Sequence, residues 1–229
     1  MKGLAPNTGK IFEKITLLSC IKEYTLVGGT ALSLQIGKRL SEDFDFCRWS
    51  SNLKSDKPIV DWPLIKAELE TIGSVQNQNI LGFDHVDFIV DGVKLSFFTK
   101  QQNLSPVENP VLFLNNIKLA DIDAIGAMKI ELILRRSAFR DYYDIYSILK
   151  EGRSLKSLLL KASKYSNYAL KTKNALLFLL NGDNFKQEKN FSELAPEYKI
   201  SNLEISQFIR ETVEKDFPEI TRNPDKKRD

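Results

Sequence analysis

The sequence has very little histidine, cysteine, methionine or tryptophan. Its 229 residues include one histidine and two each of cysteine, methionine and tryptophan. No serine or cysteine motif accompanies the single histidine, His85, which argues against catalysis by a histidine-based triad; we interpret His85 as a turn residue. Cys20 and Cys47 stand in apolar surroundings without the spacing of metal ligands, so we expect buried, reduced thiols.

A strong charge of one sign and long apolar runs are also missing. Thirty-three Lys and Arg residues against 30 Asp and Glu give a net charge of +3, too small to indicate nucleic-acid binding by itself. The first residues lack the apolar core of a secretory signal, and no apolar run reaches membrane-spanning length. We therefore expect a cytoplasmic protein with no membrane partner, built as one sizeable domain or two small ones.

One strand–helix–strand segment carries the most informative pattern. The apolar run 24–27 predicts a buried strand that ends at Gly28 and Gly29, and Thr30 can cap a short helix that continues to Ile36. Glycines let the backbone come close to a ligand, and the amides that open a helix attract anions. The glycine pair and Thr30 therefore predict a phosphate-binding turn.

Two carboxylates follow this helix on a second predicted strand. Asp43 and Asp45 alternate with Phe44 and Phe46, so the acids share one face of the strand and the rings share the other. Two close carboxylates raise each other's pKa unless a cation lies between them. Mg²⁺ favours one or two carboxylates together with nucleotide phosphates, so the segment predicts a Mg²⁺ site.

Other parts of the chain give simpler expectations. The turn signal Asp91-Gly92 predicts a hairpin between strands 86–90 and 93–98. Apolar periodicity, turn residues and capping residues predict helices over 8–22, 61–72, 175–180 and 201–216, a loop over 47–57 and a strand over 74–81.

The order of the glycine and aspartate motifs resembles a known signature. Gly28-Gly29-Thr30 followed by Asp43-Phe44-Asp45 resembles the DNA polymerase β-type nucleotidyltransferase superfamily. The longer strings 26–35 and 39–46 resemble the AbiEii/AbiGii toxins, nucleotidyltransferases of type IV-like toxin–antitoxin and phage-defence systems. The resemblance implies an α+β fold: a nucleotidyltransferase core with a mixed sheet and flanking helices (1–115), then a helical domain that completes the active site (116–222) and a flexible tail (223–229).

The sequence departs from the superfamily at one position. Polymerase β-type enzymes commonly place a third metal-binding carboxylate on a later strand, but strand 93–98 offers Ser96 and no acid. Asp87 on the partner strand is the nearest acid, and the hairpin could place it on either face. The third ligand and the number of metal ions stay open, and the departure argues against a two-metal site built from three aspartates.

A second block of sequence supports the same family. Asp121 can cap a helix that carries Lys129, and Arg140-Asp141-Tyr142-Tyr143-Asp144 follows. By resemblance, Lys129 contacts nucleotide phosphate and Asp141 is the essential acid, a role that Asp144 could fill instead.

Geometry makes this assignment conditional on a break in the helix. On one continuous helix, Asp141 would lie about 18 Å beyond Lys129 and about 120° around the axis. A break near Ser137, which can cap a second helix, would let the two side chains meet. The alternative is one long helix on which Lys129, Arg136 and Arg140 form a solvated charged stripe.

The segment that follows is basic. No acid occurs between Glu151 and Asp183, whereas residues 153–173 contain six lysines and arginines, with Tyr165 and Tyr168 among them. Such a segment could bind RNA phosphates and stack unpaired bases, but a solvated helix face explains the same charges equally well.

Together these features predict a Mg²⁺- or Mn²⁺-dependent enzyme that transfers a nucleoside monophosphate from an NTP to a hydroxyl group, and the resemblance implies that the acceptor is RNA, such as the 3′ end of tRNA. The resemblance also implies a toxic product and a cognate antitoxin. The predicted site comprises Gly28, Gly29, Thr30, Arg39 and Lys129 on the nucleotide, Asp43 and Asp45 on the metal, Asp141 as acid, and Asp144, Arg140 and Asp87 as further candidates. The alternatives are an antibiotic- or protein-modifying nucleotidyltransferase and an inactive binding module, the latter motivated by the missing third carboxylate.

Overall fold

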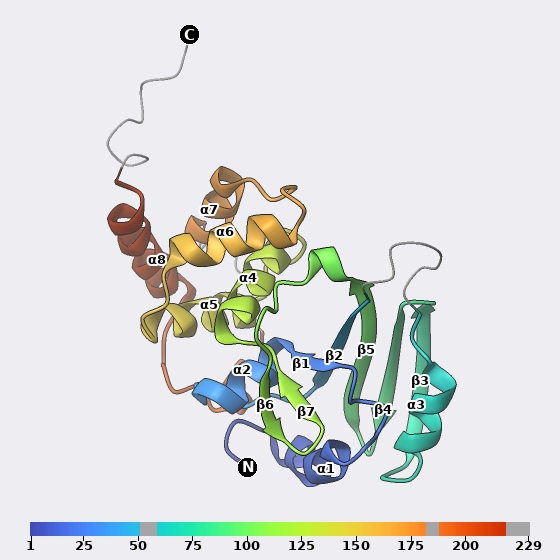
Figure 1. The fold of residues 1–229 in the computed structure, drawn as a ribbon. Helices are drawn as coiled ribbons and strands as arrows, with labels where there is room; N and C mark the ends of the chain where they lie inside the picture. Colours follow the sequence, from blue (N-terminus) through green and yellow to red (C-terminus); the bar gives the residue numbers. More distant parts are fainter. Residues whose placement is uncertain (51–58, 182–187, 219–229) are drawn as a thin grey trace. The chain divides into compact units, whose positions relative to one another are not determined.

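The structure is a computed structural model that describes residues 1–50, 59–181 and 188–218 (Figure 1). The chain divides into two compact units, of which the first comprises Met1–Ile125 with Ser192–Glu197. The second comprises Gly126–Phe191 and Tyr198–Asp229. Each unit has its own architecture and is described in turn.

The first unit is built on a mixed sheet with the strand order β3-β4-β5-β2-β1-β7-β6, which has seven strands in the described residues (Figure 1). Two strand pairs, β2–β5 and β1–β7, are parallel, and the others are antiparallel. The strands are β1 Thr25–Val27, β2 Phe44–Ser50, β3 Val75–Gly82, β4 His85–Val90, β5 Val93–Gln101, β6 Val111–Leu114 and β7 Ile117–Leu119. The prediction of an α+β fold with a mixed sheet is confirmed.

Three α-helices belong to the described part of the first unit: α1 Pro6–Thr16, α2 Gly28–Ile36 and α3 Trp62–Leu69. Helix α1 packs on the sheet through Phe12, whose ring stacks on Phe44 with centroids 5.9 Å apart. Phe46 stacks on Phe97 at 5.1 Å. The two phenylalanines of β2 are therefore buried on one face, as predicted, and the aspartates that alternate with them face the other way.

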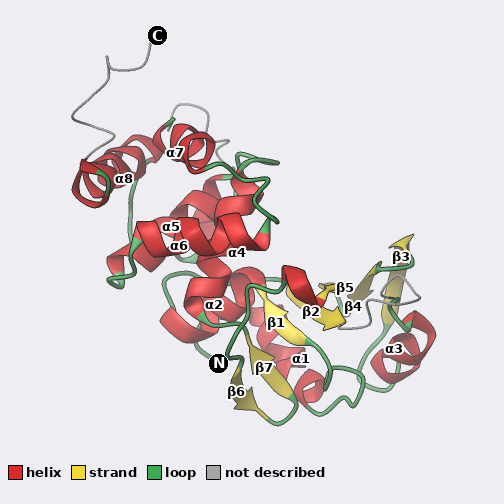
Figure 2. Ribbon diagram, turned by 45° about the horizontal axis from the view of Figure 1, so that its top comes forward, coloured by secondary structure: helices red, strands yellow, loops and turns green. Residues whose placement is uncertain are grey.

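The second unit is helical (Figure 2). Helix α4 (Ile122–Ile133) starts in the first unit and continues into the second, followed by α5 Phe139–Lys150, α6 Leu155–Tyr165, α7 Thr172–Leu180 and α8 Asn202–Asp216. A Cβ on Gly126 would lie 2.9 Å from a methyl carbon of Leu158, so α4 and α6 approach closely at this glycine. No helix in the described part of the chain is long and apolar enough to cross a bilayer.

Several predicted local signals are confirmed. The hairpin turn has Asp91 at φ 48° and Gly92 at φ 79°, as a two-residue turn between antiparallel strands requires. Asp61 caps α3 by accepting from the amide of Leu64. Ser201 and Glu204 form the complete capping box of α8, because each side chain bonds the other residue's backbone amide.

Other boundaries were wrong. The first helix ends at Thr16 rather than at residue 22, because Leu17 and Leu18 make i→i−3 bonds and the Asn116 amide then donates to both of their carbonyls. The predicted loop 47–57 begins too early: β2 continues to Ser50 because it pairs with β5 along its whole length. Residues 51–58 and the predicted tail 223–229 lie outside the described residues.

The single histidine and one cysteine also differ from expectation. His85 is not a turn residue but the first residue of β4, opposite Phe98 of β5. Both cysteines are free thiols; Cys47 is buried as expected, whereas Cys20 is only partly buried. The strands β6 and β7 had no clear sequence signal.

Candidate active site

The glycine pair lies against two charged side chains of the first unit. Gly28 opens α2 with φ +70°, and a Cβ there would lie only 2.7 Å from Oδ2 of Asp45. A Cβ on Gly29 would lie 2.6 Å from Nη2 of Arg39. A side chain at either position would have to displace one of these charged groups, and the structure brings four predicted site residues together at the start of α2.

Thr30 has a different place from the one predicted. Helix α2 begins at Gly28, and its N-cap is Val27, so Thr30 lies inside the first turn and does not cap the helix. Its side chain is buried, with the hydroxyl hydrogen-bonded to the carbonyl of Asp43 and 2.8 Å from Oγ of Ser41. Thr30 thus holds the segment that carries the carboxylates.

Arg39 is also more buried than a surface phosphate ligand would be. Its exposed fraction is 5 %, and Nη1 donates to the carbonyl of Leu40 at 2.8 Å. The guanidinium is therefore fixed in place beside Gly29, which keeps its charge at the start of α2.

Asp43 and Asp45 are the half-buried acids of this region. Asp43 immediately precedes β2, and Asp45 is its second residue. Asp45 stands opposite Val27 of β1 and Ser96 of β5. By the alternation of the strand, both carboxylates belong to the face of the sheet that is opposite to the buried phenylalanines.

The strand register shows to which face of the sheet the Asp87 side chain belongs, a question that the sequence left open. Asp45 pairs with Ser96, and Ser96 pairs with Asp87 of β4. Because directly opposite residues of neighbouring strands point to the same face, the three side chains form one row across the sheet. Ser96 occupies the middle position, and Asp87 lies one strand further from Asp45.

The Asp87 carboxylate already has three polar partners. Nζ of Lys94 lies 2.9 Å from Oδ2, Nε2 of His85 lies 3.1 Å from Oδ1, and Ser96 adds a side-chain hydrogen bond. Partial burial raises the pKa of Asp87, but the hydrogen bonds and the charge of Lys94 outweigh burial, and the pKa is lowered. Asp87 is thus an ionised carboxylate held by neighbouring side chains.

The donor set suits one hard cation. Among the described residues, no three acidic, histidine or cysteine side chains are placed to hold a metal together. Two carboxylates with substrate phosphates form an ordinary Mg²⁺ environment, so Asp43 and Asp45 fit such an ion. A cavity of about 380 Å³ is lined by Asp43, the first turn of α1 and Gly92.

In the helical unit, the predicted break brings Lys129 and the two acids together. Helix α4 ends at Ile133 and α5 begins at Phe139. Nζ of Lys129 lies 2.7 Å from Oδ1 of Asp141 and 2.7 Å from Oδ2 of Asp144. The alternative of one long helix is therefore wrong, and the N-cap of α5 is Ala138 rather than Ser137.

The three side chains of this cluster are buried, and Lys129 contacts both acids. The side chains of Lys129, Asp141 and Asp144 are exposed by 4 %, 0 % and 2 %. Burial raises the pKa of Asp141, but the charges and hydrogen bonds of Lys129 and Arg136 prevail and lower it to about 2. A carboxylate with so low a pKa is a weak proton acceptor at neutral pH, and here it holds the side chains of Lys129 and Arg136.

Arg136 is a member of the cluster that the site prediction missed. Its Nε lies 2.7 Å from Oδ2 of Asp141 and its Nη2 3.1 Å from Oδ1, a bidentate pair, while half of the side chain stays exposed. The predicted break between the helices could have indicated this role of Arg136, because a residue in the turn before α5 can reach an acid in the first turn of α5. Arg140 instead pairs with Glu188, with Nε 2.6 Å from Oε2.

The basic segment 153–173 is largely on the surface. Five of its six basic side chains are exposed: Arg153, Lys156, Lys164, Lys171 and Lys173. Tyr168 is 63 % exposed, whereas Tyr165 is buried in the helical core. Tyr165 is therefore not available to stack on a base, in contrast to the prediction.

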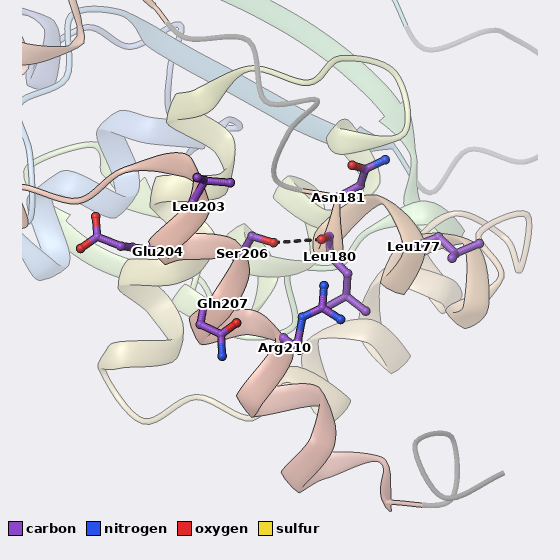
Figure 3. Close-up of a pocket in the computed structure, with 8 residues that line it drawn as sticks. All are labelled: Leu177, Leu180, Asn181, Leu203, Glu204, Ser206, Gln207 and Arg210. Atoms are coloured by element: carbon purple, nitrogen blue, oxygen red, sulfur yellow. Dashed lines mark hydrogen bonds between the residues drawn. The ribbon is translucent and has the colours of Figure 1, made fainter. Parts of the chain in front are cut away.

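A larger cavity of about 810 Å³ lies between α7 and α8 (Figure 3). Leu177 and Leu203 contribute apolar surface, and Arg210 contributes a charge. The hydroxyl of Ser206 donates to the carbonyl of Leu180 at 2.9 Å, which ties the two helices together (Figure 3). None of the predicted site residues lines this cavity.

The chain is similar to several known proteins. A curated protein of Aquifex aeolicus (strain VF5), itself uncharacterized, is 32 % identical over 172 residues, which is 73 % of this chain and 78 % of that protein. The solved structure of JHP933 from Helicobacter pylori is 20 % identical with a TM-score of 0.48, and the match covers 96 % of this chain and 98 % of that one. The Megavirus polyadenylate synthase is 13 % identical with a TM-score of 0.44, over 63 % of this chain and 31 % of that one.

The family model described as "Nucleotidyl transferase AbiEii toxin, Type IV TA system" matches residues 21–223. This range includes both the glycine–aspartate segment and the Lys129 cluster. The chain therefore belongs to the AbiEii family, the nucleotidyltransferase toxins of type IV toxin–antitoxin systems.

Proposed function

We propose that this enzyme transfers a nucleoside monophosphate from an NTP to a hydroxyl group of RNA, such as the 3′ end of tRNA, and releases pyrophosphate. The observation that carries the proposal is the close approach of Gly28 to Asp45, with 2.7 Å between a Cβ built on the glycine and Oδ2 of the acid. A backbone turn suited to phosphate thus adjoins a carboxylate suited to a divalent ion.

The residues of the first unit have roles on the nucleotide. The amides of Gly28 and Gly29, at the positive end of the α2 dipole, would bind the triphosphate, and Arg39 adds a fixed charge beside them. Asp43 and Asp45 would hold Mg²⁺ or Mn²⁺, which when bound offsets phosphate charge and polarises the reacting phosphoryl group. Thr30 keeps Asp43 in place through the backbone.

The residues of the helical unit have roles in charge balance and positioning. The ammonium of Lys129 balances the charge of the two buried acids within this unit. Asp141 and Asp144 hold its ammonium by two contacts of 2.7 Å. With a pKa of about 2 and no exposed surface, Asp141 orients Lys129 and does not act as the base.

An RNA acceptor is favoured by the surface of the helical unit. The exposed basic side chains of 153–173 match the charge of an RNA backbone, and Tyr168 presents an exposed ring for an unpaired base. The family also implies a cognate antitoxin that restrains the activity.

Labelling of RNA tests this proposal. Purified protein would be incubated with Mg²⁺, total tRNA and each α-³²P-labelled NTP in turn. We expect label on tRNA with at least one nucleotide, loss of that label in Asp45→Asn, and retention in the matched control Asp84→Asn, an exposed acid of the same unit. If the label appears on protein, or on a small hydroxylated drug added in place of tRNA, the acceptor is not RNA. If the protein binds no nucleotide, the result favours the inactive binding module.

A further inference from the structure

The face of the sheet that carries Asp43 and Asp45 also carries a lysine. Lys94 precedes Leu95, the β5 partner of Phe44, just as Asp43 precedes Phe44. Lys94 and Ser96 are two residues apart on one strand, so their side chains share the face of Asp45 and Asp87. An ammonium group therefore stands on the carboxylate face, next to the acids proposed for the metal.

The ammonium of Lys94 is held by Asp87 and is also attracted by the charges of Asp43 and Asp45. Its Nζ lies 2.9 Å from Oδ2 of Asp87. Partial burial lowers the pKa of Lys94, but its hydrogen bond and attraction to Asp87 and the charges of Asp45 and Asp43 prevail and raise it. All three carboxylates thus stabilise one protonated amine.

We propose that Lys94 is a built-in cation of the active site, which keeps Asp87 from metal ligation and limits the carboxylate face to one divalent ion on Asp43 and Asp45. This inference rests on the proposed function, because it assumes that a divalent ion binds Asp43 and Asp45. The proposal explains why β4 carries an acid although the middle position of the row is Ser96. The Asp87 carboxylate binds the side chains of Lys94, His85 and Ser96 and is not a metal ligand.

Charge balance gives the physical reason. Three carboxylates on one face can neutralise one divalent and one monovalent cation, and Lys94 supplies the monovalent charge without an ion from solution. A second divalent ion would be repelled by the ammonium and would have to displace it from Asp87. Removing the ammonium should therefore both free a ligand and remove a repulsion.

Counting bound Mn²⁺ tests the inference without any turnover. Mn²⁺ binding would be measured by electron paramagnetic resonance and by calorimetry, in the presence of a non-hydrolysable NTP analogue. We expect one Mn²⁺ per chain in the wild type, and in Lys94→Met either a second bound ion or a first ion bound about tenfold more tightly. Lys94→Arg, which keeps the charge, should bind like the wild type.

Two further variants make the result specific. In the double variant Lys94→Met/Asp87→Asn the second ion should be lost again, because its ligand is gone. Lys66→Met is the matched control: Lys66 also pairs with an acid, Glu70, and its side chain is 40 % exposed, compared with 45 % for Lys94. We expect no change in Mn²⁺ binding in this variant.

The outcomes separate this inference from the proposed function. If Lys94→Met binds Mn²⁺ with wild-type stoichiometry and affinity while Asp45→Asn abolishes binding, the role of Lys94 is refuted and the metal site stands. Two ions in the wild type would also refute it. If Mn²⁺ binding is absent in the wild type, both the inference and the metal-dependent mechanism fail.

Discussion

Lys129 and Asp141 are twelve residues apart in the chain, yet Nζ of the lysine lies 2.7 Å from Oδ1 of the acid. The two side chains meet because α4 and α5 are separated by a turn, and the pair is sealed from solvent, with exposed fractions of 4 % and 0 %. A buried cation shared by two buried acids links the stability of the helical unit to the residues proposed for catalysis.

The first prediction concerns Lys129→Met. Removing the ammonium leaves Asp141 and Asp144 buried without their shared partner, so we expect the free energy of unfolding to fall by about 3–5 kcal/mol. Denaturant unfolding measures this decrease. The exposed Lys164→Met is the control, with an expected change within about 0.5 kcal/mol. Equal stability of the two variants would show that the buried pairs contribute little.

The second prediction concerns pH. The pKa of Asp141 is lowered from 3.8 to about 2 in the folded chain. A lowered pKa stabilises the fold fully above the unfolded value, so about 2 kcal/mol should be lost as the pH falls from about 4 to about 2. Unfolding measured over this range should show a smaller decrease in Asp141→Asn than in the wild type. An identical pH dependence would contradict the assignment.

The third prediction compares two glycines. Gly28 and Gly92 both have positive φ, +70° and +79°, but only Gly28 has a neighbour, Asp45, where a Cβ would lie. Alanine at either position should lower stability by about 1 kcal/mol because of the left-handed backbone. Only Gly28→Ala should also lose nucleotidyl transfer and Mn²⁺ binding, since its methyl group displaces the Asp45 carboxylate. Equal activity of the two variants would show that Gly28 is not part of the nucleotide and metal site.

The fourth prediction concerns the basic segment. Lys164, Lys171 and Lys173 are exposed, and changing all three to glutamine should weaken RNA binding most at low salt. The slope of log affinity against log salt should decrease by about 2, at about 0.7 for each phosphate of single-stranded RNA that a lysine no longer neutralises. The same change at Lys10, Lys14 and Lys22 of the first unit is the control. An unchanged slope would indicate a solvated face.

The parts of the fold that the sequence predicted well depend on local chemistry. The Asp91-Gly92 turn and the Ser201/Glu204 capping box form within a few residues, so their motifs were sufficient. The break between α4 and α5 was favoured by the family resemblance, which places Lys129 and Asp141 in one site, because one continuous helix would keep them apart.

The features that were missed depend on interactions between residues distant in sequence. The early end of α1 depends on Asn116, about a hundred residues later, and the extension of β2 to Ser50 depends on β5. The same holds in the site. Thr30 turned inward because its hydroxyl reaches Asp43, and the row of Asp45, Ser96 and Asp87 follows from strand register that no local pattern specifies.

The central claim is that an NTP gives up its nucleoside monophosphate to RNA with loss of pyrophosphate. Parallel reactions with α-³²P- and γ-³²P-labelled NTP and the same tRNA test it most directly. We expect the α label on tRNA and the γ label in pyrophosphate, both abolished in Asp45→Asn and retained in Asp84→Asn. The γ label on RNA, or α label on tRNA that persists in Asp45→Asn, would contradict the account.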